Sequence, residues 1–244
     1  ATSDMGTNIA MQLLEKTGKS PEDIDLILVA TSTPDYLVCA TAALIQNNIG
    51  AKNAWGYDIV AACTGFLYAL ETGAKMVESG QYKNVIVIGA DTMSSIIDYT
   101  DRNTCVIFGD GGGGVLLEPT EKNDGILDSI LHTDGSGSKF LTVPGGGSLH
   151  PASKDTVGKK MHYVYQDGKI VFKFAVKNMA SVSKQILDDN SLSGDDIKLF
   201  IPHQANRRII DAAAKRCGLK EEQVFVNINR YGNTTAVVLP YLFI

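Results

Sequence analysis

The sequence predicts an α/β protein made of two similar halves that are related by a pseudo-twofold axis. Apolar runs such as residues 24–31 are typical of strands covered on both faces. Residues 23–28 are echoed by residues 196–201, and each stretch is preceded and followed by a helical pattern. The next strand of each half is expected to end at a special turn, which carries Cys63 in the first half and Asn233 in the second. This internal similarity predicts two α/β halves.

Apolar spacing and turn residues assign the elements along the chain. Helices are predicted over residues 2–17, 41–49, 66–77 and 170–190, and a further helix follows His203 and runs to residue 214. Gly50 is expected to end the second helix. Strands are predicted over residues 24–31, 85–89 and 196–201, and directly before Cys63. Residues 105–117 are interpreted as two antiparallel strands joined by a glycine turn. A phosphate loop is the alternative, but the contexts of the G-x-x-x-x-G-K-[ST] and G-x-G-x-x-G motifs both fail.

Residues 124–160 are rich in Gly, Ser, His and Pro and are expected to form an irregular excursion, of a kind that often covers a site or a partner. A strand and hairpin are expected over residues 161–170. The repeat divides the chain into residues 1–120 and residues 121–244. The first half opens on a helix, and only the start of a helix is expected after Asn233. We therefore expect the natural domain to have strands beyond both ends of this chain.

Composition argues against several classes of protein. The net charge of −5 disfavours a nucleic-acid-binding protein, and no apolar run approaches the roughly 20 residues that span a bilayer. The N-terminus lacks the basic start and apolar core of a signal peptide. The four cysteines are scattered without a C-x-x-C pair, which excludes the usual zinc spacings and predicts reduced thiols in the cytoplasm.

Three polar residues are candidates for catalysis. Cys63 ends an apolar run just before a helical pattern, where the helix dipole and unpaired N–H groups would stabilise a thiolate nucleophile; a small buried hydrophobe is the alternative. His203 follows a buried strand and Pro202, or else is a structural histidine of the turn. Asn233 lies between a glycine and two threonines, and its alternative is a turn or N-cap residue. Equivalent positions in the repeat would let the three converge on one cleft.

The sequence resembles the β-ketoacyl-acyl-carrier-protein synthase III enzymes, which have the thiolase fold. The likeness runs over essentially the whole chain, and the motifs that carry it are AACTGF at 61–66, DR at 101–102, FGDG at 108–111, PHQAN at 202–206 and GNT at 232–234. The resemblance implies a Cys63–His203–Asn233 triad. An acyl group passes from acyl-CoA to the cysteine, and malonyl-acyl carrier protein then loses CO₂ and attacks it to give a β-ketoacyl product. His203 and Asn233 would donate hydrogen bonds to the developing enolate.

The resemblance also implies binding residues for the substrates. Arg102 matches the arginine that stacks on the CoA adenine, and Gly168, Phe172 and Asn206 match positions along the pantetheine arm. The residues that match a basic patch for the acidic carrier protein are Arg208, Lys173 and Lys215. It implies a homodimer paired through strands near residues 85–89, and no metal or cofactor beyond acyl-CoA as a substrate.

The chain departs from the family pattern at several places. Val38 takes the position of a phenylalanine that reaches the partner subunit's acyl pocket, so a longer or branched primer is a hypothesis. The family's N-terminal tryptophan and arginine for CoA and its C-terminal glycine-rich strand have no counterpart here. The predicted function is the initiating condensation of type II fatty-acid synthesis. The alternatives are a related acyltransferase or condensing enzyme of a secondary pathway, and a non-catalytic scaffold that binds CoA or the carrier protein.

Overall fold

A computed structural model describes residues 1–122, 124–237 and 241–243. The chain forms two compact units, which are described separately. The described residues within Ala1–Thr92, Asp110–Ser129 and Thr234–Pro240 form the first unit, and those within Met93–Gly109, Ile130–Asn233 and Tyr241–Ile244 form the second. These units are not separated by a single cut in the sequence, and the predicted boundary between residues 120 and 121 remains a prediction.

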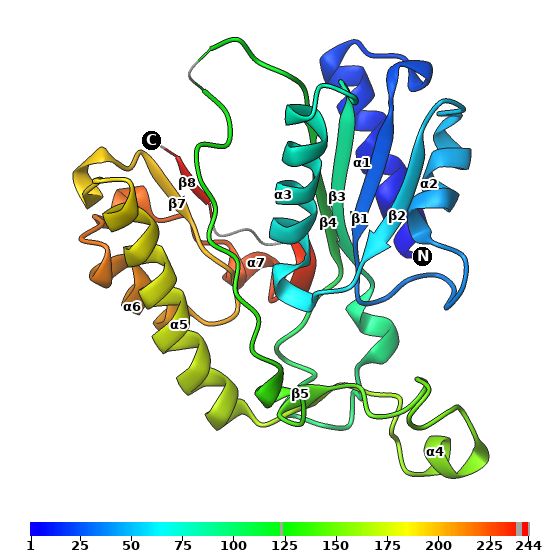
Figure 1. Ribbon diagram of the computed structural model, residues 1–244. Helices are drawn as coiled ribbons and strands as arrows, with labels where there is room; N and C mark the ends of the chain where they lie inside the picture. Colours follow the sequence, from blue (N-terminus) through cyan, green and yellow to red (C-terminus); the bar gives the residue numbers. More distant parts are fainter. Residues whose placement is uncertain (123, 238–240, 244) are drawn as a thin grey trace. The chain divides into compact units, whose positions relative to one another are not determined.

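The first unit is built on a four-stranded sheet with the strand order β2-β1-β3-β4 (Figure 1). Its strands are β1 (Leu26–Ala30), β2 (Trp55–Ile59), β3 (Val85–Asp91) and β4 (Gly111–Leu117). β1 runs parallel to β2 and β3, with Leu26 paired to Trp55 on one side and to Val85 on the other. β3 is therefore flanked on both sides, because β4 pairs with it in antiparallel fashion. The expected dimer pairing through residues 85–89 is wrong, since the backbone groups of β3 are already used within the sheet.

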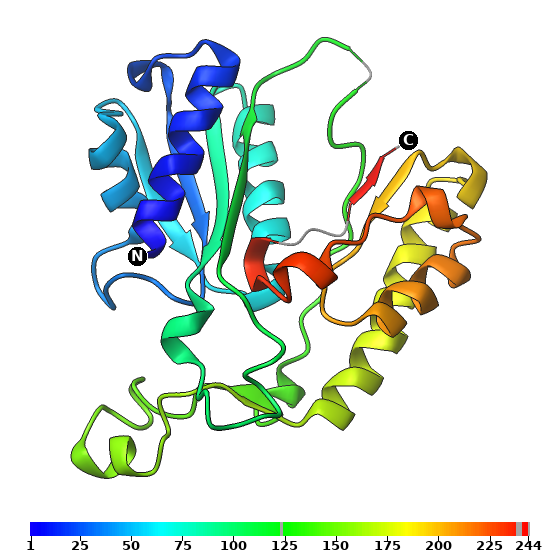
Figure 2. The same ribbon diagram turned by 180° about the vertical axis from the view of Figure 1, so that it is seen from behind.

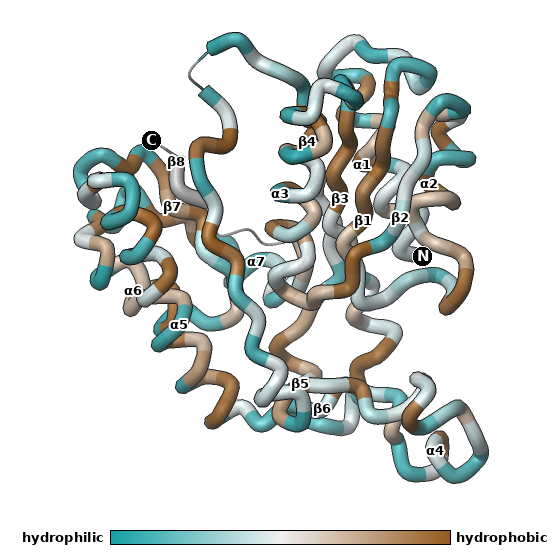
Figure 3. Tube along the Cα trace, in the orientation of Figure 1, coloured by the Kyte–Doolittle hydropathy of each residue, from teal (hydrophilic) through white to brown (hydrophobic). Residues whose placement is uncertain are grey.

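Three helices cover this sheet and bury its apolar strands. α1 (Thr2–Thr17) and α2 (Thr41–Ile49) lie on one face, and α3 (Gly65–Glu78) lies on the other, as the two opposite views show (Figures 1 and 2). β1 and β3 are buried along their whole length and stand out as apolar in Figure 3, as predicted. Gly50 ends α2 at a φ of 76°, a left-handed conformation that glycine adopts without steric cost.

The glycine run 111–114 lies inside a strand and not in a turn. It forms the first part of β4, and residues 105–108 make no strand beyond a single bridge from Phe108 to Asn233. Helix α1 crosses β4 closely: a Cβ on Gly112 would lie 2.5 Å from the Ile9 side chain, and one on Gly114 2.9 Å from it. The predicted two-strand hairpin is therefore wrong, because the glycines serve close helix-to-strand packing.

The second unit is mainly helical, with two small sheets. Its elements are β5 (Leu141–Thr142), α4 (Lys154–Gly158), β6 (Tyr165–Gln166), α5 (Gly168–Asp189), β7 (Leu199–Ile201), α6 (Arg207–Arg216), α7 (Ile228–Tyr231) and β8 (Tyr241–Phe243). α5 and α6 pack side by side, β5 pairs with β6, and β7 pairs antiparallel with β8. The predicted long helix, the strand near 200 and the helix ending near 214 are all present. The region 124–160 is largely irregular, as expected.

Two predictions for the end of the chain are wrong. No strand lies between β7 and Asn233, where all residues are described: Val224 makes one isolated bridge to Phe200, and residues 228–231 form the single turn α7. The expected helix start after Asn233 is a 3₁₀ turn, Thr235–Val237, and residues 241–243 form β8. Residues 238–240 and 244 of that expectation lie outside the described residues. None of the described helices is long and apolar enough to cross a membrane.

Candidate active site

Cys63 lies at a sharp turn between a strand and a helix, as the sequence predicted. After β2 ends at Ile59, residues 62–64 form a 3₁₀ turn, and α3 begins at Gly65. Ala62 has a φ of 46°, a left-handed conformation that costs a residue with a Cβ about 1–2 kcal/mol. Such a conformation persists only where its surroundings hold it, and here it places the cysteine directly before the helix.

The environment of Cys63 disfavours the thiolate in the resting protein. Burial of the thiol is the main cause and the negative charge of Asp91 adds to it, so that the pKa of Cys63 rises to about 12. A hydrogen bond to the backbone opposes this rise only in part. The expectation that the helix start alone stabilises a thiolate is therefore wrong for the resting protein, because desolvation outweighs the dipole.

The chain segment that follows Asn233 packs beside this turn within the first unit. The 3₁₀ turn Thr235–Val237 lies against the turn that carries Cys63. Ala236 is fully buried there, and a Cβ on Gly65 would approach the Ala236 side chain at 3.9 Å. The residue before this segment, Asn233, belongs to the second unit.

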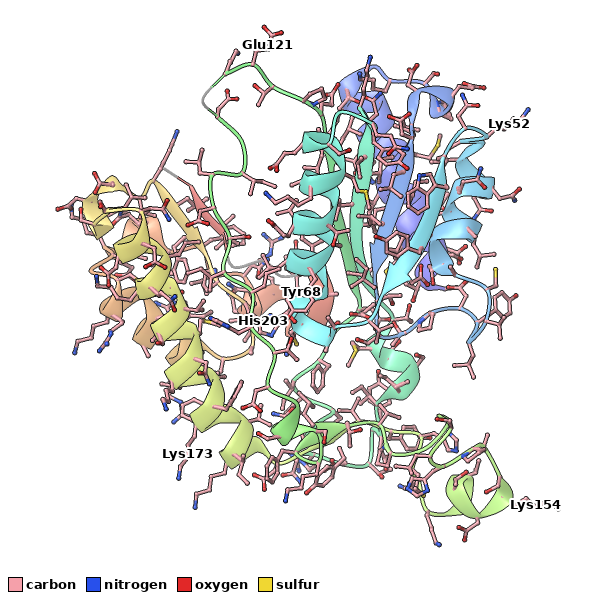
Figure 4. The ribbon with its side chains drawn as sticks, viewed as in Figure 1. Lys52, Tyr68, Glu121, Lys154, Lys173 and His203 are labelled. Carbon is pink, nitrogen blue, oxygen red and sulfur yellow. The ribbon has the colours of Figure 1, made fainter. Side chains whose placement is uncertain are left out.

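His203 lies in the second unit, directly after β7 and the buried Pro202, and is half-buried (Figure 4). The next residue, Gln204, is fully buried and ties this loop to the segment that leads to Asn233. Its amide NH₂ donates to the carbonyl oxygens of Pro202 at 2.9 Å and Phe225 at 3.1 Å. Its carbonyl oxygen accepts the N–H groups of residues 227 and 228 at 2.9 and 3.1 Å. Three of these four hydrogen bonds join the two loops, and the fourth, to Pro202, fixes the side chain within its own loop.

Asn233 is held by the backbone of residues 107 and 109, at the start of the FGDG motif. Its N–H donates to the Ile107 carbonyl at 2.9 Å, and its own carbonyl accepts the Gly109 N–H at 3.0 Å. A Cβ on Gly109 would lie 2.3 Å from the Tyr231 carbonyl oxygen, so this position needs glycine. Gly232, with a φ of 68°, ends α7 and turns the chain into Asn233. The FGDG and GNT motifs, which are far apart in the sequence, are thus joined by backbone hydrogen bonds.

Helices α5 and α6 bring several predicted binding residues together. The guanidinium of Arg208 lies over the Phe172 ring at 4.7 Å, a cation–π contact. The side-chain oxygen of Asn206 accepts the Arg208 N–H at 2.9 Å and caps α6. Gly168 is the exposed first residue of α5, where Asp167 provides the N-cap. Lys173 on α5 and Lys215 on α6 are exposed; Lys173 is labelled in Figure 4.

The other predicted residues lie in exposed loops. Arg102 follows Asp101, whose pKa is lowered because its carboxylate accepts hydrogen bonds from the Asn103 backbone and the Thr104 hydroxyl. Val38 is 98% exposed in the loop between β1 and α2 of the first unit. Cys63 and Val38 thus belong to the first unit, and the remaining predicted site residues belong to the second. Their assembly into one site remains a prediction.

Comparison with known proteins identifies the family. The sequence model of the 3-oxoacyl-[acyl-carrier-protein] synthase III family matches residues 57–135, and the model of its C-terminal part matches residues 187–243. The β-ketoacyl-[acyl-carrier-protein] synthase III of Chlorobaculum tepidum is 57% identical over 98% of this chain and 74% of the relative. The chain belongs to the β-ketoacyl-[acyl-carrier-protein] synthase III family.

Solved structures of synthase III proteins agree with this assignment. The Aquifex aeolicus protein matches with a TM-score of 0.87 and 39% identity, over 98% of this chain and 73% of its own. The Thermus thermophilus protein matches with a TM-score of 0.88 and 41% identity over the same shares. The predicted thiolase-like α/β fold is confirmed. As a synthase III, the protein is an acyltransferase of the condensing type that initiates fatty-acid synthesis.

Two supporting residues of this synthase were missed by the sequence analysis. Gln204 stands within the PHQAN motif, but only the fold shows that it links the His203 loop to the segment before Asn233. Asp91 is a fully buried carboxylate at the end of β3, and an apolar strand alone gives no sign of its role. Among the described residues, no group of three or more His, Cys, Asp or Glu side chains is arranged to hold a metal ion.

Proposed function

We propose that this synthase transfers an acyl group from acyl-CoA to Cys63 and condenses it with malonyl-acyl carrier protein. In the first step, the Cys63 sulfur bonds to the acyl carbon, the CoA thioester bond breaks, and the cysteine's proton ends on the CoA sulfur. In the second step, the malonyl group loses CO₂, and the electron pair released forms a new carbon–carbon bond to the acyl carbon. The Cys63 thioester bond breaks, and the released sulfur takes up a proton from solvent. The products are free Cys63 and β-ketoacyl-acyl carrier protein. The placement of Cys63 directly before α3 carries this proposal.

The other two triad residues act on the malonyl substrate. His203 and Asn233 donate hydrogen bonds to the thioester oxygen as enolate charge develops, and one such donor typically contributes about 3 kcal/mol to transition-state stabilisation. The backbone N–H of Cys63, at a helix start, serves the oxygen of the acyl thioester. Because the resting thiol has a pKa of about 12, ionisation of Cys63 accompanies substrate binding and does not precede it.

Helices α5 and α6 receive the carrier arm and the carrier protein. Gly168, Phe172 and Asn206 bind along pantetheine, Arg102 stacks on the adenine of CoA, and the cations Lys173, Arg208 and Lys215 face the acidic carrier protein. The Arg208–Phe172 contact supports this arrangement, because it holds a cation of the docking patch against an aromatic ring of the pantetheine path. Basic groups of this kind mainly raise the association rate and fix orientation.

The protein acts as a homodimer in the cytoplasm, without a metal or cofactor. Pairing through β2, an edge of the described sheet, replaces the pairing first expected near residues 85–89. Val38, which is exposed in its loop, contributes to the partner subunit's acyl pocket, and its small size admits a longer or branched primer.

A role in a secondary pathway is the second candidate. The priming β-ketosynthase of the R1128 polyketide pathway is 32% identical with a TM-score of 0.83, over 98% of this chain and 70% of its own. Acylation of the cysteine is the first step of both fatty-acid initiation and the priming of a secondary pathway. Condensation with the malonyl-loaded carrier protein of fatty-acid synthesis therefore distinguishes the two roles. A scaffold that only binds CoA would form no acyl-cysteine at all.

Intact-mass spectrometry with peptide mapping tests the proposed function. The protein is incubated with acetyl-, butyryl-, isobutyryl- and octanoyl-CoA, and then with malonyl-acyl carrier protein. We expect one acyl group on Cys63, its loss in Cys63→Ala, and release as β-ketoacyl product. Cys39→Ala is the matched control, because Cys39 is an exposed thiol in a loop of the same unit. If the wild type forms no adduct, the proposed enzymatic function is refuted. If the wild type accepts only acetyl-CoA, the proposal that Val38 admits longer or branched primers is refuted.

A further inference from the structure

Asp91 is a buried carboxylate that joins two separate segments of the first unit. It is fully buried at the end of β3, and none of the ion pairs found among the described residues includes it. One carboxylate oxygen accepts hydrogen bonds from the loop after β1: the Thr31 hydroxyl at 3.1 Å, the Ser32 N–H at 2.7 Å and the Thr33 hydroxyl at 3.0 Å. A buried charge is costly unless hydrogen bonds satisfy it, and these donors do so.

The second oxygen of Asp91 holds the segment that follows Asn233. It accepts the hydroxyl of Thr235 and the backbone N–H of Ala236, the latter at 3.1 Å. Both residues are buried. The carboxylate therefore fixes the third residue after Asn233 through its backbone, and not only through a side chain.

Two glycines of the sheet allow this segment to sit against the strands. A Cβ on Gly89 would lie 2.4 Å from the Ala236 carbonyl oxygen, and a Cβ on Gly111 would lie 2.8 Å from the Thr234 side chain. Neither approach would be possible with a larger residue at these positions. The segment thus packs closely against β3 and β4, and Asp91 supplies the polar contacts of this packing.

The segment is held in an unfavourable conformation. Thr235 has a φ of 53°, which is rare for any residue with a Cβ and a clear outlier for a β-branched one. Such a conformation persists only where surrounding contacts over-determine it, and these conformations cluster at functional sites. The two hydrogen bonds to Asp91, one from the Thr235 hydroxyl and one from the next backbone N–H, supply contacts of this kind.

We propose that Asp91 is a positioning residue for the condensation step, because its carboxylate locks Thr235 and Ala236 onto the sheet and so fixes the backbone that carries Asn233. The inference rests on the proposed function, in which Asn233 donates to the developing enolate. A donor to a transition-state charge must be held in place before the reaction, and a displacement of about 1 Å can cost a hundredfold in rate.

The charge of Asp91 acts in the opposite sense on the cysteine. It helps to raise the pKa of Cys63, so it disfavours the thiolate. Removing the charge therefore makes Cys63 more reactive and at the same time frees the Asn233 segment. Loss of folding would expose the buried thiol and would therefore also raise the alkylation rate. The Thr235→Val variant separates positioning from unfolding, because there only condensation falls while the alkylation rate stays unchanged.

The test separates the two steps in a set of four variants. Asp91→Asn removes the charge, Thr235→Val removes only the hydroxyl, and Thr235→Ser restores it. Asp25→Asn is the matched control, because Asp25 accepts the N–H groups of residues 83 and 84 at 2.7 and 2.9 Å at the opposite end of the same sheet. Alkylation of Cys63 by iodoacetamide is followed at pH 8, and condensation is followed in a single turnover of preformed acyl-enzyme with malonyl-acyl carrier protein.

We expect Asp91→Asn to raise the alkylation rate about threefold to tenfold and to lower the condensation rate about ten- to a hundredfold. Thr235→Val lowers condensation with the alkylation rate unchanged, and both Thr235→Ser and Asp25→Asn stay within about twofold of the wild type. A parallel fall of alkylation and condensation in Asp91→Asn, or wild-type condensation in Thr235→Val, would overturn the inference. If Asp91→Asn does not fold, the threonine pair decides alone. A wild type that forms no acyl-cysteine refutes the proposed function instead.

Discussion

At the scale of single residues, the local sequence was enough to predict where Cys63 lies, but not whether its thiol is ionised. The apolar run, Cys63 and Gly65 were enough to place the cysteine before a helix. Its ionisation could not be predicted in the same way, because burial and the charge of Asp91 come from residues far away in sequence. The local sequence predicts the helix start, which favours a thiolate. Burial and the charge of Asp91, which disfavour it, depend on the fold.

The pH dependence of Cys63 alkylation follows from this raised pKa. Because the thiolate is the reacting form, its rate should rise about tenfold per pH unit at all pH values well below 12. The measurement is iodoacetamide labelling of Cys63, followed by peptide mapping, at pH values between about 6 and 10. Circular dichroism at each pH verifies that the protein is still folded. Labelling of the exposed Cys39 on the same molecule provides the internal reference. A plateau near pH 7 would contradict the raised pKa.

At the scale of elements, strands and helices followed the apolar pattern except where packing decided. The helices and the buried strands β1 and β3 were predicted because their periodicity is local. The glycine run of β4 was mistaken for a turn, because its reason is the approach of Ile9 on α1, about one hundred positions away. The short helix α7 replaced a predicted strand for a similar reason, since the following turn is set by contacts of Gly109 and Asn233.

The close approach of α1 to β4 predicts a coupled effect of two substitutions. Gly112→Val brings new methyl groups toward Ile9, whose Cδ1 would already lie 2.5 Å from a Cβ at this position. We expect the free energy of unfolding to fall by about 1–3 kcal/mol. Ile9→Ala in the same chain should recover part of this loss, as measured by denaturant unfolding in a double-mutant cycle. Gly135→Val is the control, because nothing lies within 4 Å of a Cβ there; additive effects of the first pair would speak against the packing explanation.

At the scale of the whole molecule, the family and the fold were accessible from motifs, whereas the assembly of the site was not. AACTGF, PHQAN and GNT occupy a turn before a helix, a loop after a strand and a turn on the FGDG backbone. Each motif encodes its own local geometry, so it can be recognised one at a time. Gln204 and Asp91 join segments that are distant in sequence, and no periodicity marks such residues.

Dimerisation is the property that the sheet order constrains most directly. β1 and β3 each pair on both sides, so within the described sheet a partner can add only to β2 or β4. β2 is the better edge, because large apolar side chains are exposed on it and beside it: Trp55 is 44% exposed and Val60 is 76% exposed. We expect the wild type to be a dimer and the double substitution Trp55→Lys with Val60→Lys to shift it to monomer, as charged side chains do at edge strands. Sedimentation velocity over a range of concentrations measures this, with Met11→Lys as the control for an exposed apolar residue on α1. A doubly substituted protein that remains as dimeric as the control would exclude β2 as the interface.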